Sequence, residues 1–266
     1  MITSDQYQRI GQTIKTIADE EILTRFRALT DADIAEKKPG DLVTTADRVA
    51  EERLTEALER LLPGSVTVGE EAVSQHPDVL DLLTGDDPVW VIDPVDGTSN
   101  FVAGEPDYAC LVSLAVNGVT VASWIYAPSL PLTAGAHNGH GAWINGQPAH
   151  LVHRPETDRL DIVTTHRNYT AGFQPTIDKL NAPAITTTDC RAAGLTYVDL
   201  TRGRHDALVY TWENPWDHAA GLHLYTSCGG SNATMDGQPF RLSGGNALPF
   251  VVATSPVIKR LHAILA

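Results

Sequence analysis

Two largely apolar runs joined by an Asn-Gly pair constrain the fold of this chain more than any other feature. The runs are Leu111–Val116 and Val119–Tyr126, and Asn117-Gly118 lies between them. A two-residue turn in a β-hairpin needs positive φ angles, which Asn and Gly adopt readily. The pattern therefore predicts an antiparallel hairpin in the middle of the chain. Ala142–Ile144 followed by Asn145-Gly146 predicts another turn.

Helices and further strands are predicted on both sides of this hairpin. Apolar residues recur at helical spacing over residues 5–29. A second helix is predicted over residues 47–62, with Asp47 as its N-cap and Pro63-Gly64 ending it. Later helices are predicted at Ala192–Leu200, Asp217–Thr226 and Pro256–Leu265. Short apolar runs predict buried strands at Val66–Gly69, Val89–Ile92, Asp161–Thr165 and Asp206–Thr211.

The order of these elements indicates the fold class. Long helices and antiparallel strands fill the first half, and strands alternate with helices in the second. An α/β (α+β) sandwich with a cleft between two halves fits this order. We expect the halves to be residues 1–145 and 146–266, joined in one compact unit. Pro128–Gly141 is expected to be a mobile surface segment.

The negative net charge of the chain limits the kinds of partner that we expect it to bind. Its 266 residues carry a formal net charge of −14, which argues against a nucleic-acid binder because such proteins usually present a basic face. No apolar run approaches the roughly 20 residues that cross a bilayer, and residues 1–30 lack the apolar core of a signal peptide. We therefore expect a cytoplasmic protein with no membrane partner. Three widely spaced cysteines, Cys110, Cys190 and Cys228, predict neither disulfides nor a zinc site.

Two carboxylates at the end of a predicted strand are the first candidates for chemistry. Asp93 and Asp96 follow Val89–Ile92, Gly97 permits a tight turn, and Thr98 is a candidate for the start of a helix. Carboxylates are the hard oxygen ligands that Mg²⁺ prefers, and the N–H groups of Gly97 and Thr98 could hold phosphate oxygens. An ordinary turn rich in Asp and Gly is the alternative for this segment alone.

Further acidic groups change that balance. Gly69-Glu70-Glu71 also follows a short apolar strand, and Asp217 stands at the start of a predicted helix. Taken singly, the glutamates could be a surface pair and Asp217 a helix cap. Their combination with Asp93 and Asp96 favours a site that gathers carboxylates around cations.

Four motifs together resemble the inositol monophosphatase family. They are Asp41–Asp47, Gly69-Glu70-Glu71, Trp90–Phe101 and Trp216–Gly221, in the order and spacing of that family. The resemblance implies a layered αβαβα sandwich of the inositol monophosphatase and fructose-1,6-bisphosphatase type. It also implies Mg²⁺-dependent hydrolysis of a small phosphate monoester by an activated water, a homodimer, and inhibition by lithium.

The resemblance also implies roles for individual residues. Glu70, Asp93 and the carbonyl of Val95 would hold one Mg²⁺ ion, and Asp93, Asp96 and Asp217 the second; a third, weaker ion near Glu70 is allowed. Glu70 and Thr98 would orient the attacking water, with Asp47 accepting the hydrogen bond of the Thr98 hydroxyl. Asp217 would help to place the water that protonates the leaving group.

The residues that would select the substrate fit the family less well. Asp96, Gly97 and Thr98 would meet the phosphate end. A Gly-Thr-Ala-like stretch that contacts sugar or inositol hydroxyls corresponds to Gly194-Leu195-Thr196, where Leu195 lacks a hydroxyl. An acidic residue is expected seven positions before Asp217, but Tyr210 stands there and Glu213 is nearby out of register. Either a shifted Glu213 replaces this carboxylate or it is missing.

Several interpretations of the function remain open on the sequence. Inositol monophosphate or a similar sugar or polyol phosphate is the preferred substrate. Histidinol phosphate, fructose 1,6-bisphosphate and 3′-phosphoadenosine 5′-phosphate are alternatives. A non-catalytic regulatory protein on the same fold is an alternative of another class, and structural Ca²⁺ binding has no Asp-x-Asp-x-Asp-Gly loop to support it.

A few neighbouring residues have two interpretations. Lys37 and Lys38 lie either on a loop near the site or at the plain surface. Tyr210 and Trp212 either pack in the core or stack on an aromatic substrate, and the core is preferred. His218, beside Asp217, is expected to be a packing or surface residue.

Overall fold

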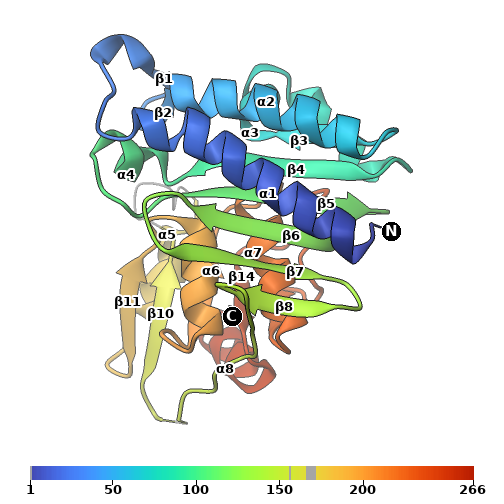
Figure 1. Ribbon diagram of the computed structural model, residues 1–266. Helices are drawn as coiled ribbons and strands as arrows, with labels where there is room; N and C mark the ends of the chain where they lie inside the picture. Colours follow the sequence, from blue (N-terminus) through green and yellow to red (C-terminus); the bar gives the residue numbers. More distant parts are fainter. Residues whose placement is uncertain (1, 156, 166–171) are drawn as a thin grey trace.

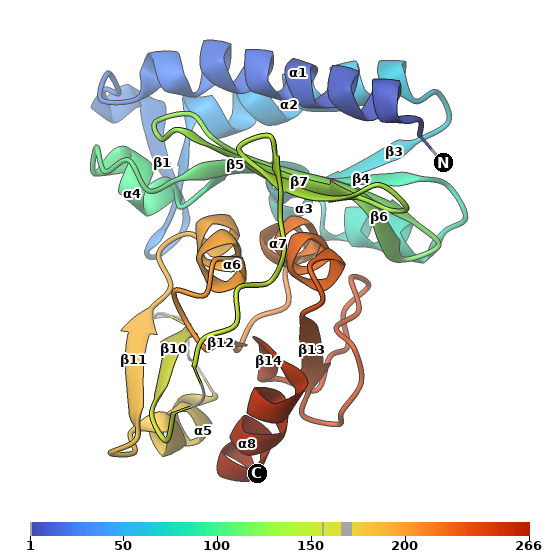
Figure 2. The ribbon, with the colours of Figure 1, turned by 60° about the horizontal axis from the view of Figure 1, so that its bottom comes forward.

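Five layers of secondary structure make up the molecule in the computed structural model, which describes residues 2–155, 157–165 and 172–266. Two helices cover one face of a first sheet, two more lie between this sheet and a second one, and a last pair covers the far side (Figures 1 and 2). The predicted αβαβα sandwich is confirmed. The outer layer on the first sheet consists of α1 (Ser4–Glu21) and α2 (Thr45–Leu61), and the middle layer of α6 (Ala193–Thr201) and α7 (Pro215–Ser227). The layer on the far side consists of α5 (Gln174–Ile177) and α8 (Ser255–Leu265).

The first sheet has seven strands in the order β3-β4-β5-β6-β7-β8-β9. Only β3 and β4 are parallel, and the other pairs are antiparallel. The predicted hairpin is confirmed as β5 and β6, with φ angles of 51° at Asn117 and 72° at Gly118. The strands are β3 (Val66–Gly69), β4 (Val89–Asp96), β5 (Ala109–Val116), β6 (Val119–Ala127), β7 (Leu132–His137), β8 (Gly141–Ile144) and β9 (Gln147–Pro148).

Burial on both faces explains the composition of β4 and β5. Every residue of β4 is buried, as are all but one of β5. Helices α1 and α2 pack on one face of this sheet, and α7 packs on the other. A strand covered on both sides is a near-continuous apolar run, so the buried carboxylates of β4 need a specific reason.

The second sheet has five strands in the order β11-β10-β12-β14-β13. Its first three strands are parallel, and β14 runs antiparallel to both of its neighbours. The strands are β10 (Leu160–Thr164), β11 (Ile185–Asp189), β12 (Ala207–Tyr210), β13 (Ser231–Thr234) and β14 (Phe250–Ala253). Short elements near the first sheet are β1 (Ile34–Lys38), β2 (Asp41–Thr44), α3 (Glu70–Gln75) and α4 (Thr98–Val102).

The first helix is shorter than predicted. It ends at Glu21 rather than near residue 29, and a 3₁₀ turn follows at Leu23–Arg25. The backbone is then extended at Phe26 and left-handed at Arg27, whose φ is 62°. This change of direction brings the Phe26 ring within 5.8 Å of the Phe101 ring, so Phe26 packs against the core, partly buried, by leaving the helix rather than by continuing it.

The second helix begins earlier than predicted, and Asp47 is not its N-cap. Thr44 is the N-cap: its hydroxyl oxygen accepts a hydrogen bond from the Ala46 N–H, and Asp47 at the third helical position accepts one from the Thr44 N–H at 2.8 Å. This reciprocal arrangement is a capping box. Helix α7 likewise begins at Pro215, which places Asp217 at its third position.

The expected surface segment Pro128–Gly141 contains a strand instead. Residues 132–137 form β7, and its last four residues are buried. Small side chains explain both facts: a Cβ on Gly135 would lie 2.2 Å from the Ser123 carbonyl oxygen, and Ala134 and Ala136 pack in one apolar cluster with Ala220 of α7. Within the described residues, no helix is long and apolar enough to cross a membrane.

Candidate functional site

A β-bulge brings Asp93 and Asp96 to the same side of the first sheet. Side chains three positions apart in a regular strand point to opposite faces. In the pairing with β5, however, Asp93 lies opposite Leu111 and Asp96 opposite Ala109, so β4 has one extra residue there. The bulge turns the second side chain around. One carboxylate oxygen from each of these residues and from Asp217 then lies within 4.8 Å of the others.

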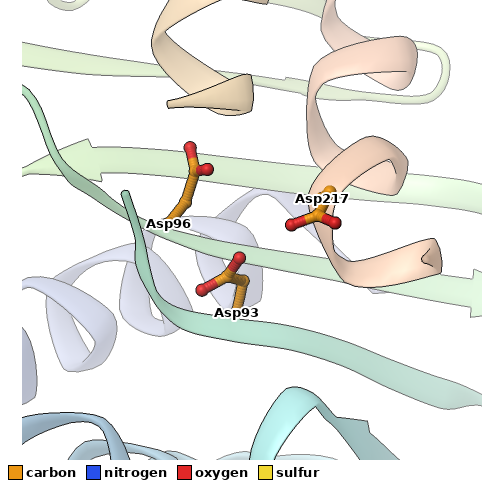
Figure 3. Close-up of side chains that lie close together, drawn as sticks. All are labelled: Asp93, Asp96 and Asp217. Atoms are coloured by element: carbon orange, nitrogen blue, oxygen red, sulfur yellow. The ribbon is translucent and has the colours of Figure 1, made fainter. Parts of the chain in front are cut away.

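Asp217 reaches this place from the middle layer of the molecule. It stands in the first turn of α7, where the helix dipole favours a negative charge. Figure 3 shows its carboxylate beside those of Asp93 and Asp96, between β4 and the start of α7. The three groups come from two distant parts of the chain, and the packing of α7 against β4 joins them.

One atom of this group indicates the kind of ligand that the site would bind. Asp93 is 1% exposed, and its Oδ1 is buried without a hydrogen-bond partner among the described residues. A buried, unpaired carboxylate oxygen costs several kcal/mol. A divalent cation would satisfy it, because such ions take oxygen ligands from carboxylates. The residues present therefore fit a Mg²⁺-like ion.

The electrostatics agree with this interpretation. Burial raises the pKa of Asp93 well above its usual value, and the charges of Glu70, Asp96 and Asp217 raise it further. Burial also raises the pKa of Asp96 to about 7, with the Asp217 charge adding to the effect. Without a cation, Asp93 and Asp96 therefore stay protonated at pH values at which a surface carboxylate is already ionised.

Asp96 also connects the first sheet to the middle layer. Its Oδ1 accepts the N–H of Ala193 at 2.8 Å, and its Oδ2 accepts the N–H of Gly194 at 2.7 Å. These are the first two residues of α6, so Asp96 caps that helix. A Cβ on Gly194 would lie 2.3 Å from Leu111 Cδ2, so this approach needs a glycine. The predicted site residue Gly194 thus lies at the carboxylate group.

The other residues predicted to select the substrate have contacts within the protein. Leu195 packs against the apolar cluster that contains Leu111. The Thr196 hydroxyl donates to the carbonyl of Ala192 at 2.7 Å. Glu213 Oε2 accepts the N–H and the side-chain amide of Asn246. Tyr210 is fully buried, as the preferred interpretation predicts.

Asp47 and Thr98 lie side by side. The Thr98 hydroxyl is 3.2 Å from Asp47 Oδ1 and 2.9 Å from the Val95 carbonyl oxygen. Burial raises the pKa of Asp47 to about 6, against the hydrogen bonds from Thr44 that lower it. Gly97 precedes Thr98 with a φ of 92°, and a Cβ there would lie 3.0 Å from the Asp107 carbonyl oxygen. The turn between β4 and α4 thus needs a glycine for two reasons.

Lys37 of β1 lies at the site and not at the plain surface. Its Nζ is 2.6 Å from Glu70 Oε1 and 2.8 Å from Glu71 Oε1. Burial alone would lower the pKa of Lys37, but the two carboxylates outweigh it and raise that pKa. Glu70 in turn acts electrostatically on Asp93, so the lysine supplies a positive charge at the edge of the acidic group.

The buried Glu51 of α2 is a residue that the sequence motifs do not reveal. Its two carboxylate oxygens accept the N–H groups of Glu71 and Ala72, each at 2.8 Å. These belong to the first turn of α3, so Glu51 fixes the helix that carries Glu70. A Cβ on Gly69 would lie 2.3 Å from the Glu51 carboxyl carbon, which explains the glycine of the Gly69-Glu70-Glu71 motif.

Trp212 makes a contact with Asp217 that neither of its two interpretations from the sequence includes. Its indole N–H donates to Asp217 Oδ2 at 2.7 Å, and the Asn214 side-chain amide donates to the same oxygen at 3.1 Å. His218 is fully buried behind it, confirming the packing interpretation. Burial lowers the pKa of His218 to about 3, so its ring is neutral. The only sequence signal for this contact is the separation of five residues between Trp212 and Asp217. In a loop, that spacing does not predict a contact.

A cavity of about 560 Å³ lies elsewhere in the second half. It is lined mainly by residues 151–155, 157, 159 and 160 and by parts of α8. None of the predicted site residues lines this cavity, so it is separate from the carboxylate group.

Comparisons with known proteins agree with the geometry. Residues 4–263 match the model of the inositol monophosphatase family. The chain is 30% identical over 210 residues to a fructose-1,6-bisphosphatase/inositol-1-monophosphatase of Thermotoga maritima, covering 77% of each. It is 30% identical over 196 residues to a histidinol-phosphatase of Chlorobaculum parvum, covering 73% of each. Among solved structures, an IMPase of Thermotoga maritima superposes with a TM-score of 0.80 at 23% identity, covering 98% of this chain and 96% of that one; this likeness shows the fold.

Proposed function

Because the chain belongs to the inositol monophosphatase family and is a phosphatase that hydrolyses phosphate monoesters, we propose that it does so with Mg²⁺ held by Asp93, Asp96 and Asp217. Two observations carry this proposal: oxygens of these three carboxylates lie within 4.8 Å of one another, and the Oδ1 of Asp93 is buried without a hydrogen-bond partner in the part of the chain that the structure describes. A structural acidic cluster would be expected to pair each oxygen with a donor.

The ligand set of the proposal includes two more residues. Glu70 and the carbonyl of Val95 would join Asp93 at one ion, and Asp96 and Asp217 would join Asp93 at the other. A third ion near Glu70 is part of the proposal. When bound, Mg²⁺ neutralises the phosphate and activates water for attack.

The remaining steps belong to side chains and backbone groups of the chain. The Thr98 hydroxyl, held beside Asp47 at 3.2 Å, would orient the attacking water together with Glu70. The N–H groups of Gly97 and Thr98 would bind phosphate oxygens at the start of α4. Asp217 would orient the water that protonates the leaving group. No side chain needs to form a covalent bond with the phosphate.

The substrate we propose is inositol monophosphate or a similar sugar or polyol phosphate. The Thermotoga maritima relative is named for inositol 1-phosphate and fructose 1,6-bisphosphate, which supports this class. Histidinol phosphate is the second candidate, supported by the Chlorobaculum parvum relative. Leu195 and Tyr210 stand where the resemblance leads us to expect polar contacts, so the leaving group is the less constrained part of the proposal.

A panel of phosphate esters tests the proposal. Phosphate release is measured from inositol 1-phosphate, fructose 1,6-bisphosphate, histidinol phosphate, 3′-phosphoadenosine 5′-phosphate and 2′-AMP, with Mg²⁺, with EDTA, and after Mg²⁺ is added back. We expect release from a sugar or polyol phosphate with Mg²⁺, loss with EDTA, and recovery on addition. Equal release with and without EDTA would contradict the role of the metal.

The resemblance leads to two further proposals. We propose that the protein forms a homodimer and that Li⁺ inhibits it by competing at the second metal position. Light scattering at several protein concentrations measures the mass, and inhibition at rising Li⁺ and fixed Mg²⁺ measures the competition. A monomer at all concentrations, or full activity at tens of millimolar Li⁺, would contradict the respective proposal.

A further inference from the structure

Asp217 receives two hydrogen bonds on one of its two oxygens. Oδ2 accepts the indole N–H of Trp212 at 2.7 Å and the amide of Asn214 at 3.1 Å. A carboxylate oxygen has two lone-pair positions, so these donors occupy Oδ2. Figure 3 shows one oxygen of Asp217 on the side of Asp93 and Asp96 and the other on the far side. The rotation of this carboxylate about its own axis is therefore set by the residues just before α7.

Trp212 is itself held in place from behind. Its carbonyl oxygen is 3.1 Å from His218 Nε2, and the Tyr197 hydroxyl is 3.1 Å from His218 Nδ1. A carbonyl only accepts, so Nε2 carries the hydrogen. In the neutral ring Nδ1 then accepts from Tyr197. Three hydrogen bonds thus run in one direction from α6 through His218 and Trp212 to Asp217.

Packing leaves the indole little freedom. The Trp212 ring lies 4.4 Å from the Tyr210 ring, edge to face, and 5.1 Å from the His218 ring. On the other side of His218, a Cβ at Gly221 would lie 2.1 Å from the Tyr197 ring. The glycine of the Trp216–Gly221 motif therefore makes room for the tyrosine that anchors the chain of hydrogen bonds.

We propose that Trp212 is a positioning residue for the metal site: its indole N–H orients the Asp217 carboxylate so that Oδ1 remains available to a Mg²⁺ ion shared with Asp93 and Asp96. This inference rests on the proposed function, because it assumes that the three carboxylates bind Mg²⁺. Partners of this kind, which touch the ligand and not the ion, change metal affinity about 10- to 100-fold when they are removed.

The test compares two tryptophan variants of the full chain. Trp212→Phe keeps an aromatic ring and removes the N–H donor. Trp143→Phe is the matched control, because Trp143 of β8 is also partly exposed but packs against Tyr7 of α1. Mg²⁺ binding to the metal-free proteins is measured by isothermal titration calorimetry, and activity is measured against Mg²⁺ concentration.

We expect Trp212→Phe to weaken Mg²⁺ binding about tenfold or more, while activity recovers at high Mg²⁺. Trp143→Phe should bind like the wild type. In an Asp217→Asn background, Trp212→Phe should add little, because the group that it orients is altered. Asn214→Ala, at an exposed position, provides a second variant that keeps the core intact, and it should weaken binding by a smaller factor.

Wild-type Mg²⁺ affinity in a folded Trp212→Phe protein would overturn the inference alone. Absence of Mg²⁺ binding to the wild-type protein would instead overturn the proposed function beneath it. If Trp212→Phe does not fold, judged by near-ultraviolet circular dichroism, Asn214→Ala decides the question.

Discussion

Asp93 stands in an environment that an ionised carboxylate tolerates only with a partner. It is 1% exposed and lies close to Glu70, Asp96 and Asp217, whose charges all raise its pKa. Bringing four buried or partly buried acidic groups together is strongly unfavourable for a stable fold. The arrangement makes physical sense when cations supply the missing charge, and Lys37 supplies a small part of it beside Glu70.

Mg²⁺ binding should therefore compete with protons. Burial and like charges raise the pKa of Asp96 to about 7 and that of Asp93 well above its usual value. Because the metal binds the ionised carboxylates, Mg²⁺ affinity should rise with pH between about 6 and 8, and binding should release protons. Calorimetry in two buffers with different ionisation enthalpies counts the protons. An affinity independent of pH, with no proton release, would contradict this.

The Thr98 hydroxyl should matter for the chemical step more than for metal binding. Thr98→Val keeps the shape and removes the group that lies 3.2 Å from Asp47 Oδ1. We expect kcat to fall about 100-fold or more, in the range of general acid–base contributions, with Mg²⁺ affinity within a factor of about three. Thr98→Ser, which keeps the hydroxyl, should retain most activity. A Thr98→Val protein with wild-type kcat would remove Thr98 from the mechanism.

At this scale, the sequence predicts the carboxylates but not the residues that support them. Asp93, Asp96 and Asp217 stand at a strand end or a helix start, and such positions can be recognised. Lys37 contacts Glu70 across 33 positions, and Glu51 contacts Glu71 across 20. No local pattern encodes such contacts, because they depend on how β1, α2 and α3 pack.

Gly97 lies in the β4–α4 turn, and Gly64 lies between α2 and β3. Comparing substitutions at these two glycines distinguishes the cost of a left-handed backbone from the cost of steric crowding. Gly97 and Gly64 have φ angles of 92° and 88°. A Cβ at Gly97 would lie 3.0 Å from the Asp107 carbonyl oxygen, and one at Gly64 would meet nothing within 4 Å. We expect Gly64→Ala to cost about 1 kcal/mol for the left-handed conformation, and Gly97→Ala to cost more and to reduce activity. Urea denaturation measures the loss of stability in both variants. Equal losses would show that the backbone at Asp107 moves aside without cost and would contradict the prediction.

The Glu51 contact with α3 should make stability depend on pH. Burial raises the pKa of Glu51 from its usual 4.5 to about 7, although the Glu71 and Ala72 N–H groups oppose this. Between these two pH values, Glu51 is therefore protonated in the folded state and ionised in the unfolded state. This contribution is full below about pH 4.5 and is lost as the pH rises to about 7, amounting to at most about 3 kcal/mol.

Glu51→Gln should flatten the dependence of stability on pH between about 4.5 and 7, because an amide does not titrate. Its exposed neighbour Glu52 provides the control, as Glu52→Gln. Thermal unfolding in EDTA at a series of pH values measures the effect. Identical pH profiles for the wild type and Glu51→Gln would show that the Glu51 carboxylate is ionised in the folded protein.

Among the elements, those with a strong local signal can be predicted. The Asn117-Gly118 hairpin is an example, since its turn chemistry is contained in two residues. The strand β7 cannot be predicted in this way, because Ala134, Gly135 and Ala136 have little apolar periodicity and become a strand by fitting between β6 and β8. Helix α1 ends at Glu21, and Phe26, five residues beyond this end, packs on Phe101, a partner far along the chain.

At the scale of the whole molecule, the carboxylate group lies where the first sheet meets the helices of the middle layer. Asp93 and Asp96 come from the first sheet, and Asp217 and the N–H groups that hold Asp96 come from α7 and α6. The order of elements predicts an α/β sandwich and the family resemblance implies its layers, but neither predicts the bulge that turns Asp96 toward Asp217. A boundary near residue 145 remains a proposal, and the first sheet continues beyond it to β9.

Because both halves contribute, one substitution in either half should abolish the chemistry while the fold persists. The most direct measurement is Mg²⁺-dependent phosphate release from the best ester of the panel by Asp93→Asn and Asp217→Asn. Asp78→Asn, at an exposed position, removes the same charge as a control. We predict a loss of at least about 100-fold in kcat/KM for the first two, which is about 3 kcal/mol of barrier, and wild-type release by the third. Wild-type release by Asp93→Asn and Asp217→Asn, with folding intact, would contradict the account.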